Sequence, residues 1–305
     1  MFVTMRDLVR HYSLESDGLC CRLTVNLGKH NVPHRNDADE WEIDRQTISL
    51  VRRIGDGKSG EVWEGLWNGT TTVAVKTPKL DKITNEEFLF EARLLKKLQH
   101  KNIIKLYAVC SRVEYPIMVM EVMKHGRLVD YLQKHNMKTP QLIDMAAQVA
   151  CGMAYLGSQH YIHRDLIARN ILVTEGNIVK IANFGMARVI ETGSAEYIGN
   201  GIEKFPVKWA APEVFFFHRF SVKSDVWSFG IVLTELITNG RTPYPGITNR
   251  DVLVKVEQGY RMPPPPGCPD QLHQIMMDCW KWDPKERPTF EYLRYTLEDF
   301  YVVSK

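Results

Sequence analysis

Apolar and polar residues alternate in short runs through the part of the chain that follows residue 48. Residues 62–67 alternate with a period of two, which is typical of a β-strand. Asn68-Gly69 follows directly and predicts a type I′ turn into a second strand over residues 72–76. The pattern therefore predicts an antiparallel hairpin over residues 62–76.

Longer periods, typical of amphipathic helices, occupy the later part of the chain. Phe88, Glu91, Leu95 and Leu98 are spaced three, four and three, within a predicted helix from about residue 85 to residue 98. Further helical patterns cover residues 141–155, 224–238 and 292 to about 300. Strands first and helices later predict an α+β fold, with a small sheet-rich lobe before a larger helical one.

The first 47 residues differ in pattern and composition from the rest of the chain. Residues 1–31 carry a short helical pattern and then one apparent strand, and residues 32–47 are rich in Pro, His, Asn and Asp. We interpret the second segment as a linker, which places the main globular part after residue 47.

Composition excludes several classes of protein. The chain has 305 residues, of which 44% are hydrophobic and 25% charged, so it is globular rather than disordered or fibrous. The net charge of +3 gives no reason to expect a nucleic-acid partner. No apolar run approaches the roughly 18 residues of a transmembrane helix, and Phe2 excludes the N-myristoylation signal. The six cysteines form no C-x-x-C pair, so we expect a reducing, cytoplasmic location.

A glycine-rich segment, Gly55-Asp-Gly57-Lys-Ser-Gly60, precedes the predicted hairpin strand. A P-loop would need glycine at Arg52, and a dinucleotide fingerprint would need a helix after Gly60, where the pattern predicts a strand. Alone the spacing would fit a structural turn. Inside an antiparallel hairpin it indicates a loop that closes over nucleotide phosphates.

A buried ion pair follows from the next two elements. Alternation along the strand places Ala74 and Lys76 on one face, where a flat base and a phosphate could lie together. Glu91 lies within the apolar stripe of the following helix, and a buried carboxylate requires a partner. We predict that Lys76 is that partner.

Three motifs then occur in order. Tyr161-Ile-His-Arg-Asp-Leu-Ile-Ala-Arg-Asn170 is followed by Ile-Leu-Val, then Asn183-Phe-Gly185, then Ala211-Pro-Glu213. Together with the glycine loop and Lys76, these motifs are similar to those of protein kinases, and residues 48–301 resemble a kinase domain throughout. The resemblance implies the two-lobed protein kinase fold, with an N-lobe over residues 48–123 and a C-lobe over residues 124–301.

Finer features resemble tyrosine kinases. Serine/threonine kinases carry lysine where Ile167 stands, and this chain has Arg169 near the end of the loop instead. Residues 205–209, Phe-Pro-Val-Lys-Trp, resemble the segment that supports a substrate phenol, which we call the substrate shelf. The sequence around these motifs is similar to that of Src-like cytoplasmic kinases, and Ile-Ala-Arg-Asn resembles the Frk, Brk and Srms group in particular. Residues 1–31 resemble the C-terminal end of a Src-homology-2 domain without its phosphotyrosine-binding arginine, so phosphotyrosine binding is not expected.

The resemblance implies ATP and Mg²⁺ as cofactors and tyrosine-bearing proteins as substrates. It assigns the catalytic roles to Asp165, Arg169, Asn170, Lys76 and Glu91, and magnesium binding to Asn170 and Asn183. Activating phosphorylation would fall on Tyr197, with Arg164 and Arg188 as partners of the phosphate. The implied ATP-binding residues are Ile54, Gly55, Asp56, Gly57, Lys58, Ser59, Gly60, Glu61, Val62, Ala74, Lys76, Glu121 and Met123.

Further residues receive structural roles from the same resemblance. Met120 would be the gatekeeper before the hinge, residues 121–123. Glu213 would pair with Arg287, and Asp225 would support the catalytic loop from a helix.

Two positions depart from the family pattern. Asn183 stands where the family has a magnesium-binding aspartate, and an amide keeps the shape but loses the charge. Ser59 replaces the aromatic residue usual at the tip of the glycine loop. Two functions therefore stay open, a tyrosine kinase with impaired catalysis and a pseudokinase that acts as a nucleotide-binding or protein-interaction scaffold.

Overall fold

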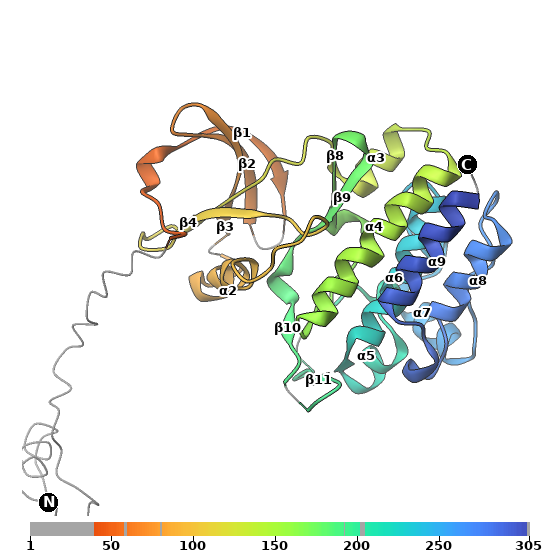
Figure 1. Cartoon of the computed structure of the whole chain (residues 1–305). Coiled ribbons are helices and arrows are strands. Elements are labelled where there is room, and N and C mark those ends of the chain that lie inside the picture. The colour runs from red at the N-terminus through yellow and green to blue at the C-terminus, as the bar shows by residue number, and fades with distance from the viewer. Residues whose placement is uncertain (1–39, 58–59, 80, 192, 202–204, 304–305) are drawn as a thin grey trace, which may run out of the picture. The chain divides into compact units, whose positions relative to one another are not determined.

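The computed structural model describes residues 40–303, apart from residues 58–59, 80, 192 and 202–204. The predictions for residues 1–31 and for most of the linker therefore lie outside the described residues. From residue 41 onward the chain forms a smaller lobe built on a β-sheet and a larger helical lobe (Figure 1), which confirms the predicted α+β architecture.

The small lobe is built on a five-stranded antiparallel sheet with the order β1-β2-β3-β5-β4. The predicted hairpin is present, and Asn68 and Gly69 have φ angles of 51° and 72°, as a type I′ turn requires. Val62 pairs with Lys76 across this hairpin. The strands are β1 (Ile48–Asp56), β2 (Gly60–Trp67), β3 (Thr71–Pro78), β4 (Leu106–Cys110) and β5 (Ile117–Met120).

Helix α2 (Asn85–Leu95) is the helix of the small lobe. It begins at a capping box, in which Thr84 Oγ1 accepts from the Glu87 amide and the Glu87 carboxylate accepts from the Thr84 amide. The helix ends at Leu95, three residues before the predicted end, because the amide of Leu98 bonds to the carbonyl of Leu95 in a tighter turn. Leu98 still packs in the core with an exposed fraction of 3%.

The last residues of the predicted linker contact the small lobe. The amide of Ile43 donates to the carbonyl of Val109 at 3.0 Å, and the amide of Val109 donates to the carbonyl of Trp41 at 2.8 Å. The Glu42 carboxylate accepts from the amide of Ser111 at 2.8 Å and from its hydroxyl at 2.6 Å. This segment therefore runs along strand β4.

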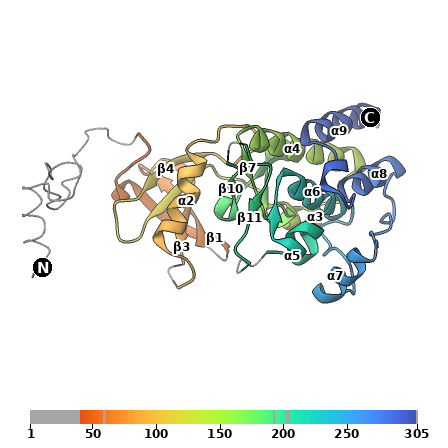
Figure 2. The same cartoon turned by 90° about the horizontal axis from the view of Figure 1, so that it is seen from below.

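The large lobe consists mainly of helices, and the three helices predicted there are present. Helices α4 and α9 lie side by side (Figures 1 and 2), and α6 is buried along most of its length. No helix in the described part of the chain combines the length and apolarity needed to cross a membrane. The helices are α3 (Leu128–Lys134), α4 (Thr139–Ser158), α5 (Pro212–Phe217), α6 (Val222–Ile237), α7 (Asn249–Glu257), α8 (Asp270–Cys279) and α9 (Phe290–Val303).

Short strands of the large lobe carry the loops of the candidate site. They form a three-stranded sheet, β6-β8-β9, and two pairs, β7 with β10 and β11 with β12. Their bounds are β6 (Gly126–Arg127), β7 (Tyr161–Ile162), β8 (Ile171–Thr174), β9 (Ile178–Ile181), β10 (Arg188–Val189), β11 (Tyr197–Ile198) and β12 (Arg219–Phe220).

Candidate active site

A buried ion pair joins the sheet of the small lobe to helix α2. Lys76 Nζ lies 2.6 Å from Glu91 Oε2, and the two residues are 7% and 3% exposed. The pairing predicted from the apolar stripe is therefore confirmed. The other carboxylate oxygen of Glu91 accepts from the amide of Phe184 at 3.3 Å, so the pair also holds the segment that contains Asn183.

Phe184 anchors that segment in the core. Its ring is fully buried and meets the ring of His163 edge-on, with centroids 5.1 Å apart. Asn183, just before it, has a φ of 65°, a left-handed conformation that asparagine tolerates better than most residues. The backbone turn at Asn183 therefore directs its side chain to the catalytic loop, residues 163–170, while Phe184 remains in the core.

The glycine loop closes the β1–β2 hairpin. The amide of Gly57 donates to the carbonyl of Gly60 at 2.9 Å. A side chain at Gly60 would collide with the backbone carbonyl of Thr77, so the close approach of β2 and β3 requires glycine there. Lys58 and Ser59 lie outside the described residues.

The other predicted nucleotide residues of this hairpin lie on its strands. Ile54 is 43% exposed at the end of β1. Asp56 is paired with Lys79, and this hydrogen bond lowers the pKa of the carboxyl. Glu61 accepts from Arg53 at 2.9 Å. Val62 packs against the core beside Ala74, which lies on the buried face of β3 that carries Lys76.

The hinge follows strand β5. Met120 and Met123 are buried, with exposed fractions of 7% and 8%. The amide of Glu121 donates to the carbonyl of Lys105, and its carboxylate accepts twice from Lys180 at 2.8 Å. The Glu121 amide is therefore already bonded, and the carbonyl of Met123 accepts from the amide of Gly126 at 3.0 Å. Among the described residues the Met123 amide has no such bond, so it is the hinge donor suited to an adenine.

Helix α6 supports the catalytic loop through hydrogen bonds to the loop backbone. Asp225 accepts from the amides of His163 at 2.7 Å and Arg164 at 2.9 Å, as predicted. Its burial raises the pKa of this carboxyl, while the two amides and the charges of His163 and Arg164 oppose the rise. Arg164 has a φ of 69°, so these bonds support a strained turn directly before Asp165.

Asp165, Asn170 and Asn183 form one hydrogen-bonded cluster. Asn170 Nδ2 donates to Asp165 Oδ2 at 2.7 Å and to the carbonyl of Asp165 at 2.8 Å. Asn183 Nδ2 donates to Asn170 Oδ1 at 3.2 Å and to Asp165 Oδ2 at 3.4 Å. Arg169 lies 3.5 Å from the other oxygen of Asp165. The cluster thus satisfies most of its own polar atoms.

The same cluster contains the oxygens that the resemblance assigns to magnesium. Amide and carboxylate oxygens are hard ligands of the type that Mg²⁺ binds, so the residues fit the ion in donor type. They fit it less well in charge, because Asp165 carries the one carboxylate of the cluster. No group of three or more His, Cys, Asp or Glu residues suited to a metal occurs elsewhere in the described residues.

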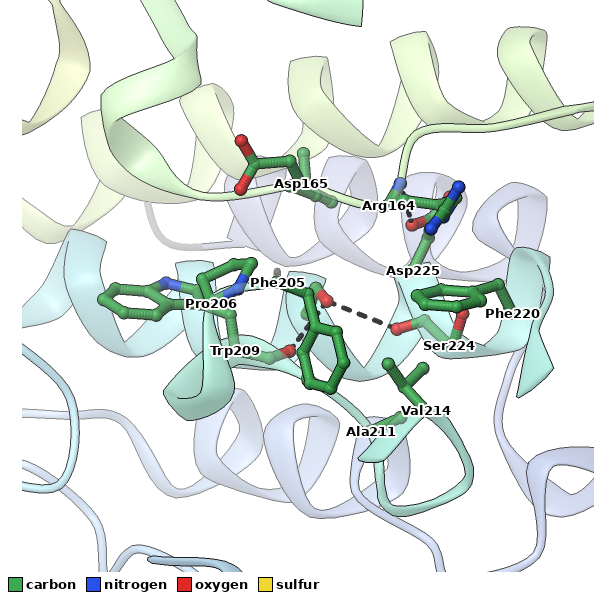
Figure 3. Close-up of a pocket in the computed structure, with 13 residues that line it drawn as sticks. Arg164, Asp165, Phe205, Pro206, Trp209, Ala211, Val214, Phe220, Ser224 and Asp225 are labelled. Atoms are coloured by element: carbon green, nitrogen blue, oxygen red, sulfur yellow. Dashed lines mark hydrogen bonds between the residues drawn. The ribbon is translucent and has the colours of Figure 1, made fainter. Parts of the chain in front are cut away.

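The substrate shelf lies against the catalytic loop. Phe205, Pro206 and Trp209 line a small cavity together with Asp165 and Arg164 (Figure 3). Ser228 of helix α6 donates to the carbonyl of Trp209 at 2.8 Å.

Tyr197 in strand β11 lies beside Arg164. The guanidinium of Arg164 stacks between the rings of Tyr197 and Phe220, at 4.9 and 4.0 Å from their centroids, and is hydrogen-bonded to Tyr197. Burial lowers the pKa of Arg164 to about 10, and the nearby charge of Arg188 adds to this effect. One cation, Arg164, therefore contacts the predicted phosphorylation site, and the charge of a second, Arg188, acts on Arg164.

The predicted bridge between Glu213 and Arg287 is present. Arg287 donates from both terminal nitrogens to the Glu213 carboxylate, at 2.6 and 2.8 Å, and its side chain is fully buried. This pair joins helix α5, directly after the shelf, to the start of α9.

One residue of the site was missed from the sequence. Glu235 of helix α6 bonds both to the catalytic loop and to the substrate shelf. The available signal was a carboxylate inside the apolar helix pattern of residues 224–238, the same signal that identified Glu91.

Comparison with known proteins gives the family. The model of the protein tyrosine and serine/threonine kinase family matches residues 48–297. The chain is 53% identical over 310 residues to tyrosine-protein kinase SRK3 of Spongilla lacustris, with 99% of this chain and 91% of that protein covered. Tyrosine-protein kinase SRK2 of the same organism is 52% identical over 311 residues, with 100% and 85% covered. The chain therefore belongs to the protein tyrosine and serine/threonine kinase family, and within it to the non-receptor tyrosine kinases.

Proposed function

We propose that this chain transfers the γ-phosphate of ATP to tyrosine hydroxyls of protein substrates, and that Asn183 slows the transfer. The observation that carries the proposal is the intact Lys76–Glu91 pair, together with the hydrogen bond that Asn170 donates to Asp165 in the catalytic loop. The relatives named tyrosine-protein kinases support the same substrate class.

Each group of the site has a role in this reaction. Lys76, fixed by Glu91, binds phosphate oxygens, and the glycine loop covers them from the small lobe. Asp165 accepts or orients the proton of the tyrosine hydroxyl, which the substrate shelf holds in line with the phosphate. Arg169, 3.5 Å from Asp165, keeps a positive charge beside this carboxylate.

Asn170 and Asn183 would hold Mg²⁺ through their amide oxygens, and the ion would neutralise charge on the transferred phosphate. In Asn183 the amide nitrogen is directed at Asn170 Oδ1 and Asp165 Oδ2. These two oxygens are the ones that the reaction needs, so the amide competes for them. An aspartate at this position would offer two acceptors and a full charge instead.

The effect on rate follows from electrostatics. Transition-state stabilisation in phosphoryl transfer depends on charges fixed around the phosphate. Losing roughly 4 kcal/mol of that stabilisation slows the reaction by about a thousandfold. We therefore propose a weakly active kinase.

A pseudokinase scaffold is the second candidate. It is favoured by the hydrogen bonds that Asn170 and Asn183 donate within the cluster, which occupy Asp165 Oδ2 and Asn170 Oδ1. Against it, the Lys76–Glu91 pair and Asp165 are arranged as a phosphotransferase requires.

A radiolabel assay separates the two candidates. The protein is incubated with [γ-³²P]ATP and a Glu/Tyr copolymer, beside the Asp165→Asn variant as an inactive control. The proposal predicts slow incorporation on tyrosine alone, above the control. Incorporation equal to the control, with nucleotide binding retained, would favour the scaffold.

We further propose the finer assignments made from the sequence. Residues 1–31 would belong to a Src-homology-2 domain, residues 32–47 would be a linker and residues 48–301 the kinase domain. The protein would act in cytoplasmic signalling and be most closely related to the Frk, Brk and Srms group. Ile-Ala-Arg-Asn in the catalytic loop supports the relationship to this group, and the Pro-, His-, Asn- and Asp-rich composition of residues 32–47 supports the linker.

A further inference from the structure

Helix α6 carries a buried carboxylate that has no role in the mechanism described so far. Glu235 is 3% exposed, and its neighbours on the helix, Leu233 and Leu236, belong to the core. An ionised group at such a position is unfavourable unless specific donors surround it.

One oxygen of this carboxylate accepts two hydrogen bonds from different loops. Glu235 Oε2 lies 3.0 Å from the amide nitrogen of Ala168 and 2.9 Å from Trp209 Nε1. Ala168 belongs to the catalytic loop, three positions after Asp165. Trp209 ends the substrate shelf and lines the cavity that contains Asp165.

Two other polar side chains of α6 each form hydrogen bonds to only one of these two segments. Asp225 binds amides of the catalytic loop, and Ser228 binds the carbonyl of Trp209. Glu235 binds both loops through the same atom. One oxygen of Glu235 therefore links the catalytic loop directly to the substrate shelf.

We propose that Glu235 is a positioning residue that aligns the substrate shelf with the catalytic loop, and that its ionisation controls how firmly tyrosine substrates are held. This inference rests on the proposed tyrosine kinase function. An ionised carboxylate accepts stronger hydrogen bonds than a neutral carboxyl group. Protonation would weaken both bonds at once and let the shelf move relative to Asp165.

The electrostatics place this change near neutral pH. Burial raises the pKa of Glu235 from 4.5 to about 7, against the opposing effects of the Trp209 and Ala168 hydrogen bonds and the charge of Arg169. Arg169, on the catalytic loop, is the charged residue identified as acting on this carboxyl. Both protonation states are then populated between roughly pH 6 and pH 8.

Ionisation of Glu235 is expected to strengthen substrate binding but to lower the stability of the fold. The folded chain holds a proton on Glu235 that the unfolded chain has released above its usual pKa of 4.5. The free energy of unfolding therefore decreases as pH rises from 4.5 through about 7. Ionised Glu235 therefore positions substrate but lowers stability, and only the effect on substrate separates a positioning role from a structural one.

The first test needs no catalytic activity. The ¹H–¹⁵N signal of the Trp209 indole is identified by its loss in Trp209→Phe and followed from pH 5.5 to pH 8.5. We expect it to shift with an apparent pKa of about 7 in the wild type and to be flat in Glu235→Gln. The Trp280 indole, which has no hydrogen-bond partner among the described residues, is the internal control. A flat Trp209 signal in the wild type would overturn the inference.

The second test measures substrate. In the Asn183→Asp background, KM and kcat for a tyrosine peptide are measured at pH 8 with Glu235→Gln and with the exposed control Glu175→Gln. Loss of a charge-assisted hydrogen bond predicts a KM about tenfold higher in Glu235→Gln, with kcat much less changed. We expect its melting temperature at pH 8 to equal or exceed that of the parent.

The outcomes separate this inference from the proposed function. A lower melting temperature with unchanged KM in Glu235→Gln would assign the residue a structural role and overturn the inference. Absence of phosphotransfer in the Asn183→Asp background would instead contradict the proposed function. The indole titration, which does not depend on turnover, would then decide the ionisation of Glu235 on its own.

Discussion

Removing the carboxylate of Glu213 is expected to destabilise the large lobe severely. The side chain of Arg287 is fully buried, and its guanidinium donates twice to Glu213. Its remaining donors bond to backbone carbonyls of Lys281, Lys223 and Trp282, at 2.8, 2.9 and 3.2 Å. In Glu213→Ala these carbonyls remain, but the buried positive charge has no counterion.

Breaking a buried ion pair by removing one partner costs about 3–5 kcal/mol. In a domain of this size, each kcal/mol shifts the melting temperature by about 2–4 °C. Glu213→Ala should therefore melt roughly 6–20 °C below the wild type. Replacing both residues, as Glu213→Leu with Arg287→Met, should recover most of this loss, because no charge is then left buried.

Circular dichroism melts at pH 7.5, with urea unfolding as a second measure, test this magnitude. The matched control is Glu298→Ala, which breaks the Arg294–Glu298 pair of helix α9, where both side chains are more than a third exposed. Such a pair contributes at most about 0.5 kcal/mol, so the control should melt within about 2 °C of the wild type. If Glu213→Ala also melts within that range, the reasoning on the buried charge is wrong.

Two further predictions concern the nucleotide site and its regulation. Met120→Gly should bind ATP-site inhibitors that carry a bulky group behind the adenine more tightly than the wild type does, because the buried Met120 side chain fills that space. Tight binding of such inhibitors by the wild type in a displacement assay would contradict the gatekeeper assignment of Met120. In the Asn183→Asp background, Tyr197→Phe should lower peptide phosphorylation severalfold, because a phosphate on Tyr197 adds about −1.5 to −2 charge beside Arg164. Tyr115→Phe, at an exposed tyrosine, is the control and should have no effect.

Features that depend on local periodicity could be predicted from the sequence. The β2–β3 hairpin follows from alternation and from Asn68-Gly69, because the strand and turn conformations are set by neighbouring residues. The pair between Lys76 and Glu91 could be predicted because a carboxylate in an apolar stripe requires a cation, and the strand before it offered one.

Features that depend on distant partners could not be predicted in the same way. The sequence places Glu235 inside a buried helix, but its two donors come from segments 67 and 26 residues away. The contact of Glu42 with Ser111 spans 69 residues within a segment whose composition indicated only a linker. The orientation of the Asn183 amide likewise depends on where the fold places Asp165 and Asn170.

Asn183 is proposed to limit phosphotransfer by this tyrosine kinase. Single-turnover phosphorylation of a Glu/Tyr copolymer by the wild type and by Asn183→Asp, with ATP affinity measured separately, tests this limit. We expect a rate about a thousandfold higher in Asn183→Asp, with a much smaller change in ATP affinity, because the restored charge acts mainly in the transition state. Equal rates for the two proteins would contradict it.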